Sequence, residues 1–116
     1  MFMTTAAIAL AVAAQDAAPR VTISPSGYRE AKRCEALVEA AARLSPADAP
    51  DDALYDAGLY WSLAAARAAE LAGLDPARVA ADQERERAEA SARLSGEDPE
   101  ARATLARCRA ATPDMG

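Results

Sequence analysis

Apolar and polar side chains recur with helical spacing from about residue 25 to residue 113, and no segment shows the alternation typical of a strand. One side of the first segment is apolar or small: Tyr28, Ala31, Cys34, Val38 and Ala41. The opposite side is charged: Lys32, Glu35, Glu39 and Arg43. We therefore expect an amphipathic first helix that opens at Ser24-Pro25 or Ser26, ends near Leu44 and turns its charged side away from the core.

Capping residues mark the other helix boundaries. A stretch rich in proline and aspartate, 46–52, precedes the second helix, and Gly73 ends it. The third and fourth helices each open with a capping aspartate followed by proline at the first helical position: Asp75-Pro76 and Asp98-Pro99. Gly96 closes the third helix and Pro113 stops the fourth. The sequence therefore predicts four helices.

The second helical segment, 53–74, comes closest to an uninterrupted apolar run. It contains Asp56, Arg67 and Glu70, so it does not read as a membrane-spanning helix. On a helical wheel these three charges fall within about 60° of one another. We interpret the segment as the central helix of the bundle, with one narrow stripe in water.

The third helical segment is dominated by charges of both signs: Asp82, Glu84, Arg85, Glu86, Arg87, Glu89 and Arg93. Its apolar line is thin, because Gln83 and Glu86 interrupt Val79, Ala90 and Leu94. Pairs three or four residues apart support a solvated face, which is our interpretation. A peripheral helix, or polar residues that face a partner or another copy, are the alternatives.

Alanine dominates the composition, and large apolar residues are few: Leu37, Val38, Leu44, Leu54, Leu59, Trp61, Leu63, Leu71, Leu74, Val79, Leu94 and Leu105 are most of them. Alanine favours helix, but each buried methyl group removes little apolar area from water. The sequence therefore predicts an all-α fold with a thin core, either a small four-helix bundle or a pair of helical hairpins.

The N-terminal residues 2–14 carry no charge and end in small residues before Gln15, which resembles a secretory signal peptide. We expect a cleaved signal peptide over 1–14, an extended leader over 15–24, one helical domain over 25–113 and a tail over 114–116. An uncleaved segment or a cytoplasmic leader are the alternatives. Cleaved export predicts a periplasmic or secreted bacterial protein without a membrane span.

Cys34 and Cys108 are the two cysteines of the chain, and each falls on the inward side of its predicted helix. In an exported protein this placement predicts a disulfide between the first and last helices, and two buried reduced thiols are the alternative. Closing a loop of roughly 75 residues stabilises a fold by about 4 kcal/mol on the chain-entropy model. For a small domain with a thin core, that is a major contribution.

Arginines flank both cysteines and form a candidate basic spot: Arg33, Arg107 and Arg109. Cations near the end of the last helix complement its dipole, which is one interpretation. The others are an anion or partner contact, or a redox-active cysteine pair whose thiolates are stabilised by the positive neighbours.

The chain contains no histidine, which excludes histidine-based catalytic triads and histidine-ligated metals. Acidic residues outnumber basic ones 18 to 13, and no basic run or aromatic track suits nucleic acid. No nucleotide or hydrolase motif is present. We therefore expect no cofactor, no metal and no nucleic-acid partner.

The second helix contains a candidate small-molecule site: Tyr55, Asp56, Tyr60 and Trp61. Asp56 and Tyr60 are four residues apart and share a side of the helix, and a phenol beside a carboxylate orients ligands or transfers protons. The alternative is that Tyr55 and Trp61 fill the core while Asp56 and Tyr60 lie at its edge.

These patterns indicate a function class and no specific function. We expect a small exported cell-envelope protein that is not an enzyme and acts as a protein-binding module, either with another envelope protein or by self-association. A periplasmic stress chaperone or inhibitor is the alternative. A small-molecule-binding protein or a carboxylate-based enzyme is favoured less.

Overall fold

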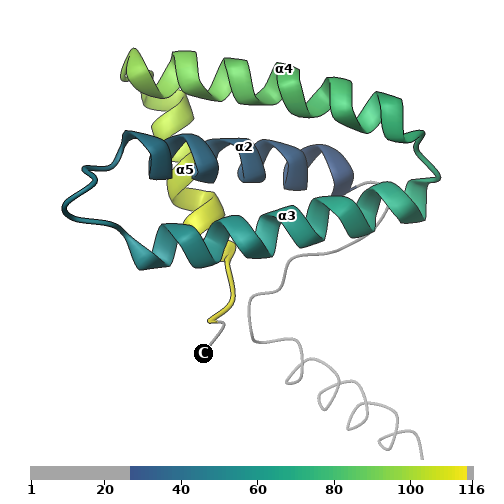
Figure 1. Cartoon of the computed structure of the whole chain (residues 1–116), viewed down its shortest axis with the longest axis horizontal. Coiled ribbons are helices and arrows are strands. Elements are labelled where there is room, and N and C mark those ends of the chain that lie inside the picture. Colours follow the sequence, from purple (N-terminus) through teal and green to yellow (C-terminus); the bar gives the residue numbers. More distant parts are fainter. Residues whose placement is uncertain (1–26, 115–116) are drawn as a thin grey trace, which may run out of the picture.

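The computed structural model describes residues 27–114, and four helices make up this part of the chain (Figure 1). They are α2 (Tyr28–Leu44), α3 (Asp52–Ala72), α4 (Pro76–Ser95) and α5 (Pro99–Ala111). No strand occurs between residues 27 and 114. The all-α fold and the small helical bundle are confirmed. The predicted signal peptide and leader, and the last two residues of the tail, lie outside the described residues.

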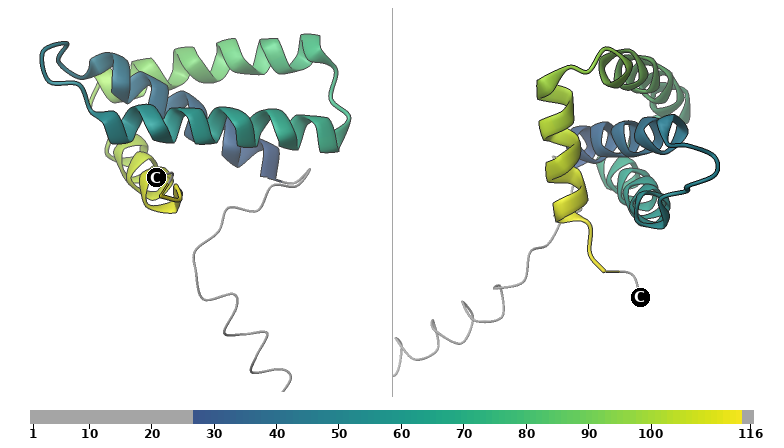
Figure 2. Two further views of the ribbon diagram at one scale, coloured as in Figure 1. Left: turned by 60° about the horizontal axis from the view of Figure 1, so that its bottom comes forward. Right: turned by 90° about the vertical axis from the view of Figure 1, so that its left-hand side faces the viewer.

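The central helix of the bundle is α2. Helices α3 and α4 lie on opposite sides of α2, and α5 crosses one face of these three helices (Figure 1 and Figure 2). The prediction that 53–74 forms the central helix is wrong, because α3 packs extensively on α2 alone. Both sides of α2 are used for packing, whereas one side of α3 remains open.

Most of the predicted capping residues lie at the observed helix ends. The Asp51 carboxylate accepts a hydrogen bond from the Leu54 amide at 3.2 Å at the start of α3, and Asp98 accepts one from Glu100 at 3.3 Å at the start of α5. Asp75 occupies the cap position of α4 but makes no side-chain cap bond. The first helix begins at Tyr28 after Gly27, and not at Ser24 or Ser26.

The turn after α4 differs from the turn after α3. Gly73 follows α3 with a φ of 66°, in the left-handed region where glycine has no steric penalty. Gly96 follows α4 with a φ of −84°, and it is Glu97 that adopts the left-handed conformation, with a φ of 57°. The predicted glycine signal is at the correct helix end, but the strained position is one residue later.

The main core lies where α2, α3 and α5 meet. Val38 and Trp61 are its fully buried side chains, and Cys34 and Cys108 pack against them. The predicted disulfide is confirmed: Cys34 and Cys108 are bonded, with their Cα atoms 5.5 Å apart. The Trp61 indole donates hydrogen bonds to the Cys108 carbonyl at 3.3 Å and to Thr112 Oγ1 at 3.0 Å. The indole therefore fastens α3 to the end of α5 next to the disulfide.

The interface between α2 and α4 has an apolar part and a polar part. In the apolar part, Leu37 and Ala40 of α2 pack against Ala90 and Leu94 of α4. The polar part lies toward the start of both helices. Tyr28 donates a hydrogen bond to Asp82 at 2.9 Å, and Lys32 donates to Glu35 at 3.0 Å and to Gln83. Farther along α2, Arg43 donates to Ser91 at 3.2 Å. The expectation that the charged side of the first helix faces away from the core is wrong, because α4 covers it and buries Lys32 and Glu35.

The third predicted helix, now α4, is solvated on one face only. Pairs within the helix do occur on it, such as Arg93 with Glu89 at 3.2 Å. Its other face turns Asp82 and Gln83 toward α2. The polar residues of α4 thus bind another helix of the same chain, because α2 presents complementary polar groups.

Within residues 27–114, no helix combines the length and the apolar character that crossing a membrane requires.

Candidate functional site

The open side of α3 carries large apolar side chains. Tyr55, Leu59 and Leu63 are 67%, 46% and 68% exposed. Their spacing of four residues places them along one side of the helix, and we call this row the α3 face. Scattered apolar residues are common on protein surfaces, but a contiguous row marks an interaction site more often.

A groove adjoins the α3 face. It has a volume of about 340 Å³ and runs between α3 and α2, with α4 at its rim. Tyr55 and Leu59 form its apolar wall. At the rim, the Arg87 guanidinium and the Glu39 carboxylate lie 3.8 Å apart, and Arg87 Nε and Glu39 Oε1 are buried without hydrogen-bond partners. The groove therefore combines an apolar wall with incompletely satisfied polar atoms.

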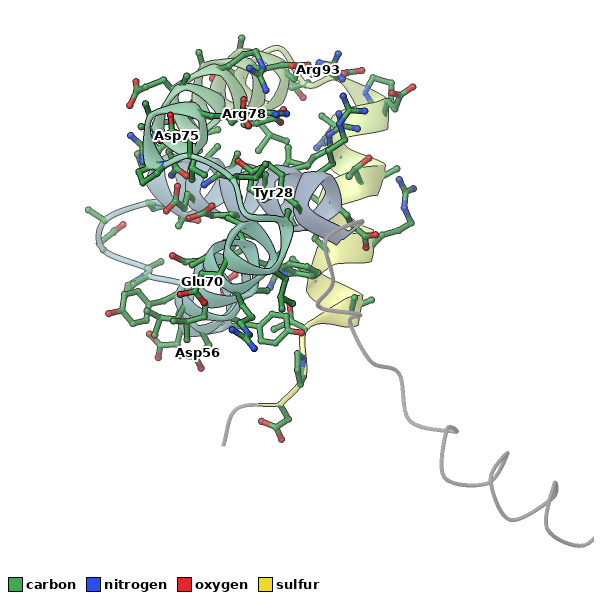
Figure 3. The ribbon with its side chains drawn as sticks, turned by 90° about the vertical axis from the view of Figure 1, so that its right-hand side faces the viewer. Tyr28, Asp56, Glu70, Asp75, Arg78 and Arg93 are labelled. Carbon is green, nitrogen blue, oxygen red and sulfur yellow. A yellow bond between two sulfur atoms is a disulfide. The ribbon has the colours of Figure 1, made fainter. Side chains whose placement is uncertain are left out.

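Charged residues border the α3 face at both ends. Asp52 and Asp56 lie toward the start of α3, and Arg67 and Glu70 lie toward its end. Asp56 lies on the side of α3 that is remote from α2 (Figure 3). Arg67 and Glu70 form an exposed ion pair at 3.3 Å. One end of the face is acidic, and the other end carries Arg67, the single basic residue of α3.

The four residues of the predicted small-molecule site do not converge. Trp61 is fully buried in the core, where the half-buried Tyr60 ring contacts it edge-on at 5.2 Å, and burial raises the pKa of Tyr60. Tyr55 and Asp56 are exposed. The interpretation of Tyr55 as a core filler is wrong, because Tyr55 is 67% exposed and lies about 120° from the buried Trp61 around the helix.

The three arginines of the predicted basic spot have different neighbours. Arg33 borders a groove between α2 and α4. Arg107 donates a hydrogen bond to Thr104 Oγ1 at 3.0 Å, and Arg109 donates one to Asp51 at 3.3 Å. Arg109 thus fastens the end of α5 to the start of α3, and no contact joins it to Arg33.

Sequence reasoning missed Leu59 and Leu63 as surface residues, since it counted them among the large apolar residues of the core. A usable signal existed: Tyr55, Leu59 and Leu63 recur every four residues, apart from the side that contains Trp61. Among residues 27–114, no group of histidine, cysteine, aspartate and glutamate is arranged to hold a metal ion.

The fold and this surface define a class, a small helical bundle with one disulfide and one open apolar helix face. Comparisons with protein-family models, with curated proteins and with solved structures find no match to the chain. Its function is therefore argued from its own residues.

Proposed function

We propose that this chain is an exported, non-enzymatic interaction module of the bacterial cell envelope that binds protein through the α3 face. The exposure of Tyr55, Leu59 and Leu63 in one row carries the proposal. Aromatic and aliphatic side chains of this kind anchor protein interfaces, since desolvating them is favourable and needs no polar partner.

Export is supported by two features. The Cys34–Cys108 disulfide is of a kind that persists in oxidising compartments and is rare in the cytosol. The uncharged, alanine-rich residues 2–14 resemble a signal peptide. The two features together support a periplasmic or secreted location.

The absence of histidine and the engagement of the titratable groups support a role without catalysis. Tyr28 and Asp82 show pKa shifts, and each is bound to the other across α2 and α4. Groups held in this way serve packing more readily than proton transfer, which needs a group accessible to substrate.

The partner that best fits the α3 face is a second copy of the chain, with the two α3 helices antiparallel. Pairing that places Leu59 opposite the partner's Leu63 brings the leucines of the two apolar rows together. The same register places the partner's Arg67 opposite Tyr55, between Asp52 and Asp56. Two equivalent acid–base contacts form, because the contact has two-fold symmetry.

Parallel pairing has no such complementarity, since it aligns Asp56 with the partner's Asp56 and Arg67 with the partner's Arg67. Antiparallel pairing also opposes the two helix dipoles. Its one like-charge approach brings the partner's Glu70 near Asp52, in the first turn of α3, where the free amide groups favour a carboxylate.

Sedimentation velocity of the mature chain tests this proposal. We expect a monomer–dimer equilibrium with a Kd of about 10–100 µM, since a contact of three helical turns lies at the low end of specific interface areas. Leu63→Glu should weaken the dimer at least about tenfold. Leu71→Glu is the matched control, because Leu71 is 44% exposed but lies outside the row.

A charge exchange tests the register. Asp56→Arg and Arg67→Asp should each weaken the dimer about threefold to tenfold, and the two together should restore it. A chain that remains monomeric at about 1 mM, or that loses its dimer equally with Leu63→Glu and Leu71→Glu, would contradict self-association through the α3 face.

A further inference from the structure

A second groove lies between α2 and α4, next to the start of both helices. It has a volume of about 580 Å³. Its cations are Arg29, Lys32, Arg33, Arg78 and Arg85, and we call this set the basic groove. Five cations and three carboxylates line it, and a fourth carboxylate, Glu35, pairs with Lys32 at 3.0 Å, so cations outnumber acids there although the whole chain has a net charge of −5. The sign of the local charge is therefore the reverse of that of the molecule.

Part of the basic groove is neutralised from within. Tyr28 and Arg78, at the starts of α2 and α4, are seen along the helices in Figure 3. Asp82 accepts the Tyr28 hydrogen bond and pairs with Arg85 at 3.0 Å and with Arg78 at 3.7 Å. One carboxylate thus serves two guanidinium groups and a phenol.

Arg29 and Arg33 are not neutralised in this way. Among the described residues, neither makes a hydrogen bond or an ion pair. They are four residues apart on α2, so they project from the same side of the helix. Two adjacent guanidinium groups without protein partners have their full donor capacity available to a ligand.

The other carboxylates of the groove do not neutralise the charges of Arg29 and Arg33. Glu89 is held by Arg93 at 3.2 Å, and Glu86 approaches Arg85 at 4.0 Å. Glu86 is the weakly paired acid of the groove. Its carboxylate repels an anion that binds nearby and so weakens the binding.

We propose that the basic groove binds a phosphate-bearing anion, with Arg29 and Arg33 donating to its oxygens. Guanidinium groups match phosphate because their planar N–H pairs bond two oxygens at once. Arg78 and Arg85 on the opposite wall add positive potential. The ligand is either a free phosphorylated compound or the headgroup of a phospholipid, and the two share this chemistry.

Two probes distinguish these sources. Inorganic pyrophosphate, titrated calorimetrically into the mature chain at low salt, represents a free ligand. Vesicles of phosphatidylglycerol in phosphatidylcholine, assayed by co-sedimentation, represent a lipid surface, and vesicles of phosphatidylcholine alone give the background.

The test variant is Arg29→Gln with Arg33→Gln, which removes no hydrogen bond or ion pair of the described residues. We expect this variant to bind the probe that the wild-type chain binds, pyrophosphate or vesicles, at least about tenfold more weakly. The matched control is Arg43→Gln with Arg102→Gln, since both arginines lie beside the far end of α2 and the net charge changes equally. We expect the control to change binding less than about twofold. Glu86→Gln should bind more tightly.

Pyrophosphate binding lost in the test variant alone supports a free phosphorylated ligand, and vesicle binding lost in the same way supports a lipid headgroup. The proposal is overturned if the wild-type chain binds neither probe. Equal loss in the test and control variants also overturns it, because net charge alone then explains the binding.

Discussion

Tyr28 and Asp82 show at the scale of single residues how α2 and α4 are joined. Their hydrogen bond of 2.9 Å is buried, and Arg78 and Arg85 face the same carboxylate from α4. Burial and the bond to Asp82 raise the pKa of Tyr28 to about 12. The bond from Tyr28, followed by the bond and charge of Arg85, lowers the pKa of Asp82.

These pKa shifts give the fold a pH dependence of defined sign. The neutral Tyr28 phenol stabilises the folded state fully below its ordinary pKa of 10.0, and this contribution is lost as the pH rises toward 12. The Asp82 carboxylate stabilises the folded state above its ordinary pKa of 3.8, and this contribution is lost as the pH falls through its lowered folded value.

The substitution Tyr28→Phe tests the contributions of Tyr28 and Asp82 to stability. Removing the phenol should lower the free energy of unfolding at pH 7 by about 1 kcal/mol, since a buried hydrogen bond is lost while the two arginines still pair with Asp82. Urea unfolding measures this change, and NMR titration of the Asp82 carboxyl carbon should show a higher pKa than in the wild-type chain. Unchanged pKa and stability would contradict a stabilising role for the bond.

At the scale of helices, the two sides of α2 bind by different chemistry. The side with Cys34 and Val38 packs against Trp61 and the alanines of α3, which excludes water from the main core. The side with Lys32 binds the polar groups of α4. A helix that is amphipathic by sequence is therefore covered on both sides, since α4 presents Asp82 and Gln83 to the polar groups of α2 and presents Ala90 to its apolar residues.

The end of α4 provides a test of helix termination. Glu97 has a φ of 57°, which costs a residue with a Cβ about 1 kcal/mol relative to glycine, and its ion pair with Arg102 is an exposed one at 3.8 Å. Glu97→Gly should raise the free energy of unfolding by roughly 0.5–1 kcal/mol, as measured by thermal and urea unfolding. Glu97→Ala is the control, because it removes the ion pair and keeps the strain. A gain in stability with alanine as large as with glycine would rule out this explanation.

At the scale of the whole molecule, the disulfide joins residues 74 positions apart and closes the bundle between its first and last described helices. It lies in the core beside Trp61, whose indole bonds the Cys108 carbonyl. The bridge and the indole act on the same junction of α2, α3 and α5.

Removing the bridge should therefore affect the entire bundle. Cys34→Ala with Cys108→Ala should lower the free energy of unfolding by about 4 kcal/mol, which is a large share of the stability of a small domain. Urea unfolding followed by Trp61 fluorescence measures this loss, and intact mass under non-reducing conditions verifies the bridge in the purified chain. Equal unfolding midpoints for the two chains would show that the bridge adds no stability.

The sequence alone determined the four helices, most of their ends and the inward orientation of both cysteines. These features are local: they depend on helical spacing and on capping residues such as Asp51, Gly73 and Asp98, and they need no knowledge of distant segments. The pairing of Cys34 with Cys108 followed because the chain has no other cysteine.

The tertiary structure decided which helix is central and which apolar row stays open. Both α2 and α3 are amphipathic or apolar by sequence, and only their packing shows that α2 is covered on two sides while Tyr55, Leu59 and Leu63 face outward. It also brought Arg78 and Arg85 opposite Arg29 and Arg33. These outcomes depend on contacts between residues far apart in the chain, and helical periodicity specifies the faces of a helix but not what covers each face.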